Sequence, residues 1–546
     1  MRSVRLRRWQ KAALDRFRER QHPEFLAVAT PGAGKTTMAL VAARQHLAEH
    51  PRRRLVVVAP TQHLKGQWAD AAESLDLHLE AAWSARDGRL PADTHGLVTT
   101  YQQVAGNAPA LAEIARDAFV VLDEVHHAGD DRAWGDAVRV AFCDAAVRLC
   151  LSGTPFRSDT RAIPFVRYDD DDLAEPDVEY GYGDALRDGS VVRPVRFPRI
   201  DGEMEWIGAD GEEVSASFED YLDPVRAAQR LRTALSVEGE WLPHVLERAH
   251  GQLRDVRRSH PGAGGLVIAI DQEHARGIAG IMRRRLGVAP VLVVSEDSGA
   301  SRRIAEFARG TEPWLVAVRM VSEGVDIPRL RVGVYATTTT TELFFRQAVG
   351  RLVRWTRGLG AQPSYMFIPD DVRLRKHAIE IADQRRHSLR RLDENGDPVE
   401  EQEPDPLEEP VEREVVDEQL SLFAAISAVP VGAPAVYRVE DALAPSHMSR
   451  ANPDDDGVVL ELAPAPLLAE PPDGVEAPRR GLREYRQELR DANAALTRQI
   501  ARITGLSHAQ VNLELNRRVG VARVSEATID QLARRREMAR GWLATA

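Results

Sequence analysis

The stretch "FLAVATPGAGKTTMALVAA", residues 25–43, decides the fold of this chain. Its apolar run ends at Ala29, two glycines follow, and a segment of helical composition begins at Lys35. Glycines between a strand and a helix let backbone N–H groups turn inward around phosphate oxygens, and the helix dipole favours the anion. The stretch therefore predicts a phosphate-binding loop, with Ala29 at the position where the general motif has glycine.

The residues of this loop have expected roles in binding ATP together with Mg²⁺. Lys35 is expected to reach the β- and γ-phosphates, and the hydroxyl of Thr36 is expected to be a ligand of Mg²⁺. A plain glycine turn before an ordinary helix is the alternative, which a Gly-Lys-Thr sequence after a strand disfavours. The predicted nucleotide-binding residues are Pro31, Gly32, Ala33, Gly34, Lys35, Thr36 and Thr37.

A second motif, "VVLDEVHH" at residues 120–127, places two carboxylates at the carboxyl end of a buried strand. Ligand sites of open α/β sheets gather at such ends. Asp123 is expected to hold Mg²⁺, and Glu124 to orient and deprotonate the attacking water. An ion-paired strand end is the structural alternative. His126 and His127 could instead be metal ligands, an alternative that the motif does not favour.

A third motif is "FFRQAVGRLVR", residues 344–354. Gln347, Gly350, Arg351 and Arg354 are spaced by three and four residues, so they share one face of a helix. Gly350 keeps that face thin, which lets both guanidinium groups approach a partner surface. Taken alone, the pattern favours a solvated basic helix face. Beside the first two motifs it predicts arginine fingers, which stabilise charge on a transferring phosphoryl group.

The composition of the 546-residue chain is that of a protein with substantial cores: 43% of its residues are hydrophobic and 28% are charged. The net charge of −11 argues against a uniformly basic surface, although nucleic-acid binding depends on local patches. Two cysteines provide no disulfide framework, and no apolar run is long enough to span a membrane. We expect a soluble, cytoplasmic protein without membrane contact.

Short apolar runs alternate with helical stretches twice along the chain, which predicts an α/β fold with two parallel-sheet domains. After residue 390 the character changes: from Asp393 to Glu418 there are thirteen acidic residues, one basic residue and four prolines. Such a segment is expected to be a disordered tether, although "GVVLELA" at 457–463 reads as a short strand. The expected units are a first domain at 1–190, a partly helical inter-domain segment at 191–260, a second domain at 261–390, an acidic and Ala/Pro-rich linker at 391–478 and a basic helical domain at 479–546.

The motifs and their order resemble those of the superfamily 2 helicases and translocases, nearest to the branch with the type III restriction ATPase subunits. The resemblance spans about Val4 to Asp370 and implies two tandem RecA-like domains that bind ATP and Mg²⁺ between them. By this resemblance "LRRWQKAAL" (6–14) places Gln10 where the family reads adenine. "SEGVDIP" (322–328) supplies Gly324 and Asp326 at the domain interface, together with Gln347.

Other matched stretches concern nucleic acid and coupling. "APTQHLKGQW" (59–68) and "VTTYQQVA" (98–105) correspond to elements that touch the nucleic-acid backbone. "SGTPFRSD" (152–159) corresponds to the segment that couples hydrolysis to domain movement.

The function that the resemblance implies is an ATP-dependent DNA helicase or double-strand DNA translocase. One alternative is the motor subunit of a restriction or phage-defence complex that works with a separate nuclease. Another alternative is an RNA helicase, which the form of the "DEVHH" and "SGTPFRSD" motifs disfavours. The arginine-rich helical tail suits a module that binds a duplex or a partner, and it suits equally a small bundle with a solvated basic face.

Overall fold

The strand that precedes the phosphate loop lies inside a seven-stranded sheet of the computed structural model, in the order β4-β5-β3-β6-β7-β2-β8. All its pairings are parallel. Helices α2 and α3 pack on one face and α4 and α5 on the other. The strands are β2 (Glu24–Ala29), β3 (Leu55–Ala59), β4 (Leu79–Glu80), β5 (Gly96–Thr100), β6 (Phe119–Leu122), β7 (Val147–Ser152) and β8 (Val178–Tyr180). The helices are α1 (Arg8–Arg18), α2 (Lys35–Glu49), α3 (Gln62–Glu73), α4 (Tyr101–Ala115), the 3-10 helix η2 (Val125–Gly129), α5 (Arg132–Phe142) and α6 (Tyr182–Arg187).

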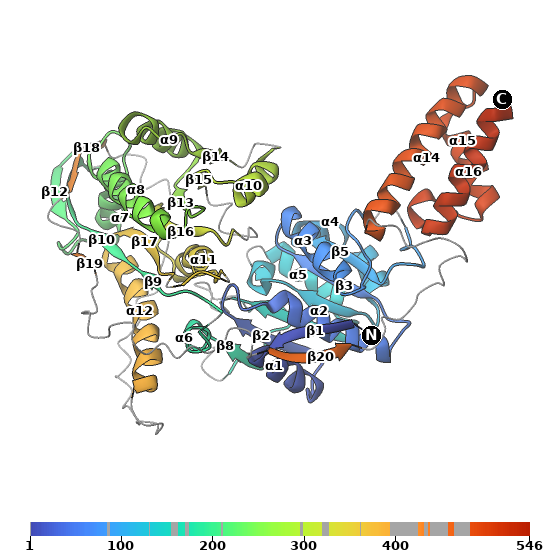
Figure 1. Cartoon of the computed structure of the whole chain (residues 1–546), viewed down its shortest axis with the longest axis horizontal. Coiled ribbons are helices and arrows are strands. Elements are labelled where there is room, and N and C mark those ends of the chain that lie inside the picture. Colours follow the sequence, from blue (N-terminus) through green and yellow to red (C-terminus); the bar gives the residue numbers. More distant parts are fainter. Residues whose placement is uncertain are drawn as a thin grey trace.

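The second sheet follows the order β14-β15-β13-β16-β17-β10-β19, and β9 also pairs with β17. Its strands pair in parallel except for β19, which is antiparallel to β10. The two sheets form the two predicted α/β domains, which lie side by side in Figure 1. The central elements are β13 (Gly264–Ala269), α9 (Gln272–Leu286), β14 (Val291–Val293), α10 (Ala300–Arg309), β15 (Trp314–Val318), β16 (Leu330–Ala336), α11 (Glu342–Leu352), β17 (Ser364–Pro369) and α12 (Val372–Asp393).

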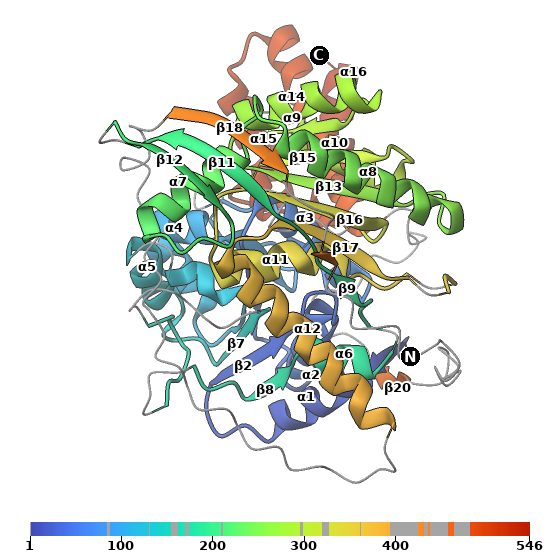
Figure 2. The same ribbon diagram turned by 90° about the vertical axis from the view of Figure 1, so that its left-hand side faces the viewer.

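The segment at 191–260, expected between the domains, is built into the second one. Its helices contribute Leu231 and Leu246 to the core beneath the second sheet, and Trp206 joins the same core. Figure 2 shows β11 and β12 beside α7 at the edge of this domain. The elements are β9 (Val195–Arg196), β10 (Pro198–Ile200), β11 (Gly202–Ile207), β12 (Glu213–Ser217), α7 (Pro224–Ala234) and α8 (Trp241–Ser259).

Three stretches of the segment expected to be disordered are strands that pair with the two domains. β18 (Ala424–Pro430) pairs with β11, β19 (Ala435–Val436) pairs with β10, and β20 (Gly457–Leu462) pairs with β1 (Arg2–Arg7). The prediction of disorder is therefore wrong for these stretches. The short strand read at 457–463 is confirmed. The apolar side chains of Ala428 and Leu462 explain the difference, because each is buried in the core of a domain.

The C-terminal helices form an arm that projects from the first domain (Figure 1). They are α14 (Leu482–Thr504), α15 (His508–Val519), η5 (Val524–Glu526) and α16 (Ile529–Thr545). The buried Arg535 donates to the side chains of Asn493, Asn512 and Asn516, which ties α14, α15 and α16 together. The predicted small helical domain is thus a bundle with a polar centre.

The structure describes residues 2–84, 88–129, 132–153, 162–169, 174–189, 191–208, 211–294, 299–318, 327–356, 358–360, 362–393, 424–430, 435–436, 457–462 and 481–545. Over these ranges, no helix combines the length and the apolar character that crossing a membrane requires.

Candidate functional site

The phosphate loop connects β2 to α2 in the conformation that its glycines predict. Gly32 and Gly34 have φ angles of 86° and 92°, a left-handed region in which a side chain would be strained. The Nζ of Lys35 lies 3.0 Å from the carbonyl oxygen of Ala29 and 3.1 Å from the Oε1 of Glu124. The lysine therefore already spans the loop and the carboxylate motif.

Three side chains from the start of the chain hold the outer side of this loop. The Nη1 of Arg7 donates to the carbonyl oxygen of Gly32 at 2.7 Å, and the indole N–H of Trp9 donates to that of Ala33 at 3.0 Å. The Nε2 of Gln10 donates to the carbonyl oxygen of Gly34 at 2.8 Å. Carbonyl groups held outward leave the N–H side of the loop facing the site, as phosphate binding requires.

Gln10 is buried, and its amide is engaged at both ends, because its Oε1 also accepts from the backbone N–H of Arg7 at 2.8 Å. Its side chain supports the loop and does not line the cavity described below. Its role in reading adenine stays a prediction.

The two carboxylates of the second motif lie at the end of β6 and differ in their environment. The Oδ2 of Asp123 accepts from the indole N–H of Trp68 at 2.7 Å, and the backbone oxygen of Asp123 accepts from the hydroxyl of Tyr101 at 3.0 Å. Burial, and then the charge of Glu124, raise the pKa of Asp123 to about 6. Trp68 was not singled out from the sequence, although it ends the "APTQHLKGQW" stretch.

Glu124 has a positive φ angle of 46°, unusual for a residue with a side chain. Its Oε2 accepts from the backbone N–H of Gly153 at 2.9 Å. Burial alone would raise the pKa of Glu124, but Lys35, His126 and the Gly153 amide outweigh burial and lower this pKa to about 2. Glu124 is thus held as a carboxylate beside the loop.

The ring of His126 lies close to polar groups of both domains. Its Nδ1 lies 3.2 Å from the Oγ of Ser152 and 3.7 Å from the Oε2 of Glu124, while its Nε2 lies 3.4 Å from the Nε2 of Gln347. Within the described ranges, neither His126 nor His127 belongs to a group of three side chains spaced to hold a metal ion. The metal-ligand alternative for this pair therefore gains no support.

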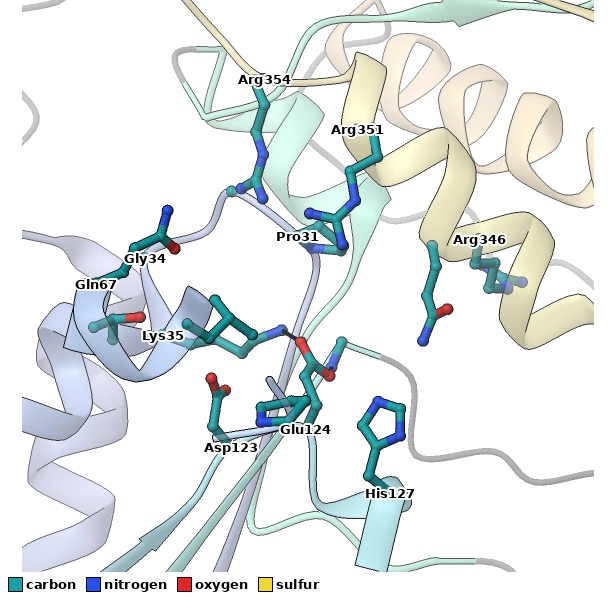
Figure 3. Close-up of a pocket in the computed structure, with 16 residues that line it drawn as sticks. Pro31, Gly34, Lys35, Gln67, Asp123, Glu124, His127, Arg346, Arg351 and Arg354 are labelled. Atoms are coloured by element: carbon teal, nitrogen blue, oxygen red, sulfur yellow. Dashed lines mark hydrogen bonds and ion pairs between the residues drawn. The ribbon is translucent and has the colours of Figure 1, made fainter. Parts of the chain in front are cut away.

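Helix α11 of the second domain brings the third motif against the phosphate loop (Figure 3). A Cβ on Gly350 would lie 2.7 Å from the Cγ of Pro31, so the helix backbone rests directly on the loop. The Nη1 of Arg354 lies over Gly32, at 2.8 Å from where a Cβ of that glycine would be. Arg351 extends from the same side in the close-up view. The thin helix face expected from the glycine is therefore present for Gln347, Gly350 and Arg351. Arg354, expected on the same face, lies beyond the helix end at Leu352, where its backbone forms a bridge with Val192.

These groups enclose a cavity of about 300 Å³ between the two domains. Its lining includes ten of the predicted site residues: Pro31, Gly32, Gly34, Lys35, Thr36, Asp123, Glu124, Gln347, Arg351 and Arg354. Ala33, Thr37 and Gln10 are predicted residues outside the lining. Gly324 and Asp326 lie outside the described residues. The lining also contains residues that were not selected as site residues from the sequence: Pro60, Leu64, Gln67, His127, Gly153 and Arg346.

The stretches expected to touch nucleic acid begin the two helices α3 and α4. Thr61 and Thr100 cap these helices by accepting from the backbone N–H groups of Leu64 and Gln103. The Nζ of Lys65 donates to the Oε1 of Gln103 at 3.0 Å, and Lys65 is only 5% exposed. Lys65 therefore links the two helices, and contact of these two stretches with a nucleic-acid backbone stays a prediction.

Residues 3–157 match the family described as "Type III restriction enzyme, res subunit". "Uncharacterized protein Rv2917" of Mycobacterium tuberculosis is 46% identical over 410 residues, which cover 74% of this chain and 66% of that protein. The match thus spans about two thirds of that relative. "Uncharacterized protein ML1624" of Mycobacterium leprae is 40% identical over 565 aligned positions, covering 97% of this chain and 92% of that protein.

A solved structure, "ATP-dependent Type ISP restriction-modification enzyme LlaBIII bound to DNA", aligns with a TM-score of 0.46 and 16% identity over 71% of this chain and 30% of that chain.

Proposed function

Since the chain belongs to the superfamily 2 helicases, in one family with its mycobacterial relative of similar length, we propose that it is an ATP-driven motor that moves along DNA. The chain is a helicase-like ATPase motor related to restriction enzyme subunits. We infer in addition that DNA is its substrate and that movement along DNA is its output.

The observation that carries the proposal is that charged side chains from both domains line one cavity. The first domain contributes Lys35, Asp123 and Glu124, and the second contributes Arg351 and Arg354. A cavity with phosphate-loop N–H groups on one wall and arginines on the other suits a polyphosphate between the domains. Hydrolysis that removes a phosphoryl group would then remove the charge that holds the domains together.

The residues around the cavity have separable tasks in this proposal. A bound polyphosphate would compete with Glu124 for the ammonium of Lys35, because the two side chains now form an ion pair at 3.1 Å. Released from Lys35, the ionised Glu124 could accept a proton from water. The residues fit Mg²⁺, which would be held by the Thr36 hydroxyl and Asp123 and would supply charge neutralisation at the phosphates.

Arg351 and Arg354 would stabilise the charge that develops on the transferring group. Because they belong to the second domain, their engagement ties the chemistry to the relative position of the two domains. The contact between Gln347 and His126 adds a polar link at the same boundary. Closing and opening of this interface would move two regions that bind the nucleic-acid backbone relative to each other along one strand.

The preference for DNA rests on the family match to a restriction enzyme subunit and on the resemblance of the "DEVHH" and "SGTPFRSD" motifs. The same match favours a second candidate, in which the chain is the motor of a restriction or defence complex and a separate nuclease cuts. The two candidates share one motor and differ in what is bound to it.

A strand-displacement assay together with a triplex-displacement assay tests the proposed output. A helicase separates a tailed duplex, whereas a double-strand translocase removes a third strand and leaves the duplex intact. Both assays are run with ATP and with the Glu124→Gln variant as the inactive control. If wild-type protein hydrolyses ATP but displaces no strand in either assay, it does not move along DNA and this part of the proposal is wrong.

A further inference from the structure

Strand β20 follows the second domain in the chain and pairs with the first strand of the protein. The two form an antiparallel sheet of their own, with Arg2 opposite Leu462, Val4 opposite Leu460 and Arg7 opposite Gly457. Separate from the seven-stranded sheet of the first domain, β1 has β20 as its strand partner. A two-stranded unit is marginal on its own and needs packing against other elements.

One face of this small sheet supplies that packing. Leu6 is fully buried, Leu462 is 1% exposed, and Val4 and Leu460 pack partly buried against the same core. The opposite face points outward: Val459, opposite Arg5, is 63% exposed. Leu462 and Leu460 therefore fasten β1 to the first domain, while Val459 contributes little.

The end of β1 leads directly into the residues that hold the phosphate loop. Arg7 ends the strand, Trp9 and Gln10 follow in α1, and the three donate to the carbonyl oxygens of Gly32, Ala33 and Gly34. Trp9 is itself fixed by stacking on Tyr180, with ring centroids 5.0 Å apart. A shift of β1 would therefore loosen three successive carbonyl groups of the loop.

We propose that β20 is a strap that positions the nucleotide loop through β1, so that a strand from beyond the second domain sets nucleotide affinity. The inference rests on the proposed function, because it takes the loop to be the nucleotide site. Leu460 and Leu462 are positioning residues in this account, and they act through Arg7, Trp9 and Gln10. A loop that is already held in its binding conformation loses less conformational entropy when the nucleotide binds.

The test compares Leu462→Asp with the matched control Val459→Asp in the full-length chain. Each variant introduces the same charge on the same strand, one toward the core and one toward solvent. ADP with Mg²⁺ is titrated onto each protein, and the KM for ATP and the kcat are measured. We expect Leu462→Asp to weaken ADP binding and raise KM by about 10- to 100-fold, with kcat at saturation kept within severalfold. Val459→Asp should stay within about twofold, and Leu462→Met should restore wild-type affinity.

Hydrogen exchange supplies a readout besides activity. In Leu462→Asp the amides of residues 2–7 and 32–35 should exchange faster, while those of β3 and β6 keep their protection. The milder variant Leu460→Asn should show the same effects to a lesser degree. Unfolding of the whole first domain in both variants would overturn the positioning role and make β20 a general part of the core.

The outcomes separate the strap from the proposed function. If wild-type protein binds no nucleotide, the proposed function fails. If wild-type protein binds ADP and Leu462→Asp binds it equally well while β1 exchanges freely, the strap alone is wrong.

Discussion

Gly350 and Pro31 are the point at which the second domain rests on the phosphate loop of the first: a Cβ on Gly350 would lie 2.7 Å from the Cγ of Pro31. Such a distance is too short for two carbon atoms, so only glycine permits this approach. Arg351 reaches the cavity because the helix lies this close, and Arg354 reaches it from just beyond the helix end at Leu352.

The first prediction concerns this contact. Gly350→Ala should push α11 away from the loop and lower the ATPase turnover by at least about tenfold, since small misplacements of catalytic groups are costly. Nucleotide binding through Lys35 should be kept within severalfold. Gly251→Ala is the control, because Gly251 also lies within a helix and a Cβ there would meet open space. Equal loss of activity in both variants would contradict the account.

The second prediction concerns Arg351. Arg351→Ala should lower turnover by about 10³- to 10⁵-fold, the effect of losing an arginine finger, with nucleotide affinity largely kept. Single-turnover hydrolysis measures the first quantity and a binding titration the second. Arg302→Ala, at an exposed arginine of α10 in the same domain, serves as the control. If Arg351→Ala keeps its activity within severalfold of wild type, the motif is a solvated basic helix face and Arg351 is not an arginine finger.

The third prediction concerns how the helical arm is held. Arg486 pairs with Asp93 at 2.9 Å and Arg490 pairs with Glu80 at 3.0 Å, and all four side chains are largely buried. Arg490→Glu should therefore undock the arm, because it places two carboxylates together. The double variant Arg490→Glu with Glu80→Arg should redock it. Small-angle scattering at low and high salt measures the change, and an unchanged profile for the single variant would show that these pairs do not hold the arm.

The fourth prediction concerns acid stability. Burial, and then the neighbouring charges of His50 and Arg53, lower the pKa of His46 from 6.5 to about 4. Between pH 6.5 and pH 4 the unfolded chain binds a proton that the folded chain does not, so the free energy of unfolding falls as the pH falls. Urea unfolding at pH 7 and pH 5 should show a smaller decrease for His46→Gln than for wild type. An equal decrease would mean that His46 does not contribute.

The parts of the site that could be predicted from the sequence are those made by neighbouring residues. The loop from Pro31 to Thr36 and the pair Asp123 and Glu124 are local motifs at strand ends, and strand ends of a parallel sheet meet at one edge. The spacing of Gln347, Gly350 and Arg351 likewise defined a helix face, whereas Arg354, which the same spacing placed on that face, lies beyond the helix end. The sheets followed from continuous apolar runs such as "RLVVVAP".

The parts that could not be predicted depend on contacts between distant segments. The hydrogen bond from Trp68 to Asp123 links α3 to the end of β6, and no local sequence pattern predicts it. The resemblance assigned Gln10 to reading adenine, but the direction of its amide depends on Arg7 and Gly34. The sequence did not reveal the pairing of β20 with β1, because acidic and proline-rich sequence surrounds a mostly apolar run of six residues.

That pairing also determines the expected effect of truncation. A chain that ends near residue 390 lacks the whole segment that was expected to be a tether. Because such a chain lacks β18, β19 and β20, we now expect it to lose nucleotide affinity.

The central claim is that one cavity between two domains couples ATP hydrolysis to nucleic acid. The most direct measurement is the ATPase rate of wild-type protein alone and with single-stranded DNA, duplex DNA or RNA, beside Lys35→Ala and Glu124→Gln. We predict a rate that DNA stimulates, loss of nucleotide binding in Lys35→Ala, and binding without hydrolysis in Glu124→Gln. A wild-type rate that no nucleic acid changes, or full hydrolysis by Glu124→Gln, would contradict the account.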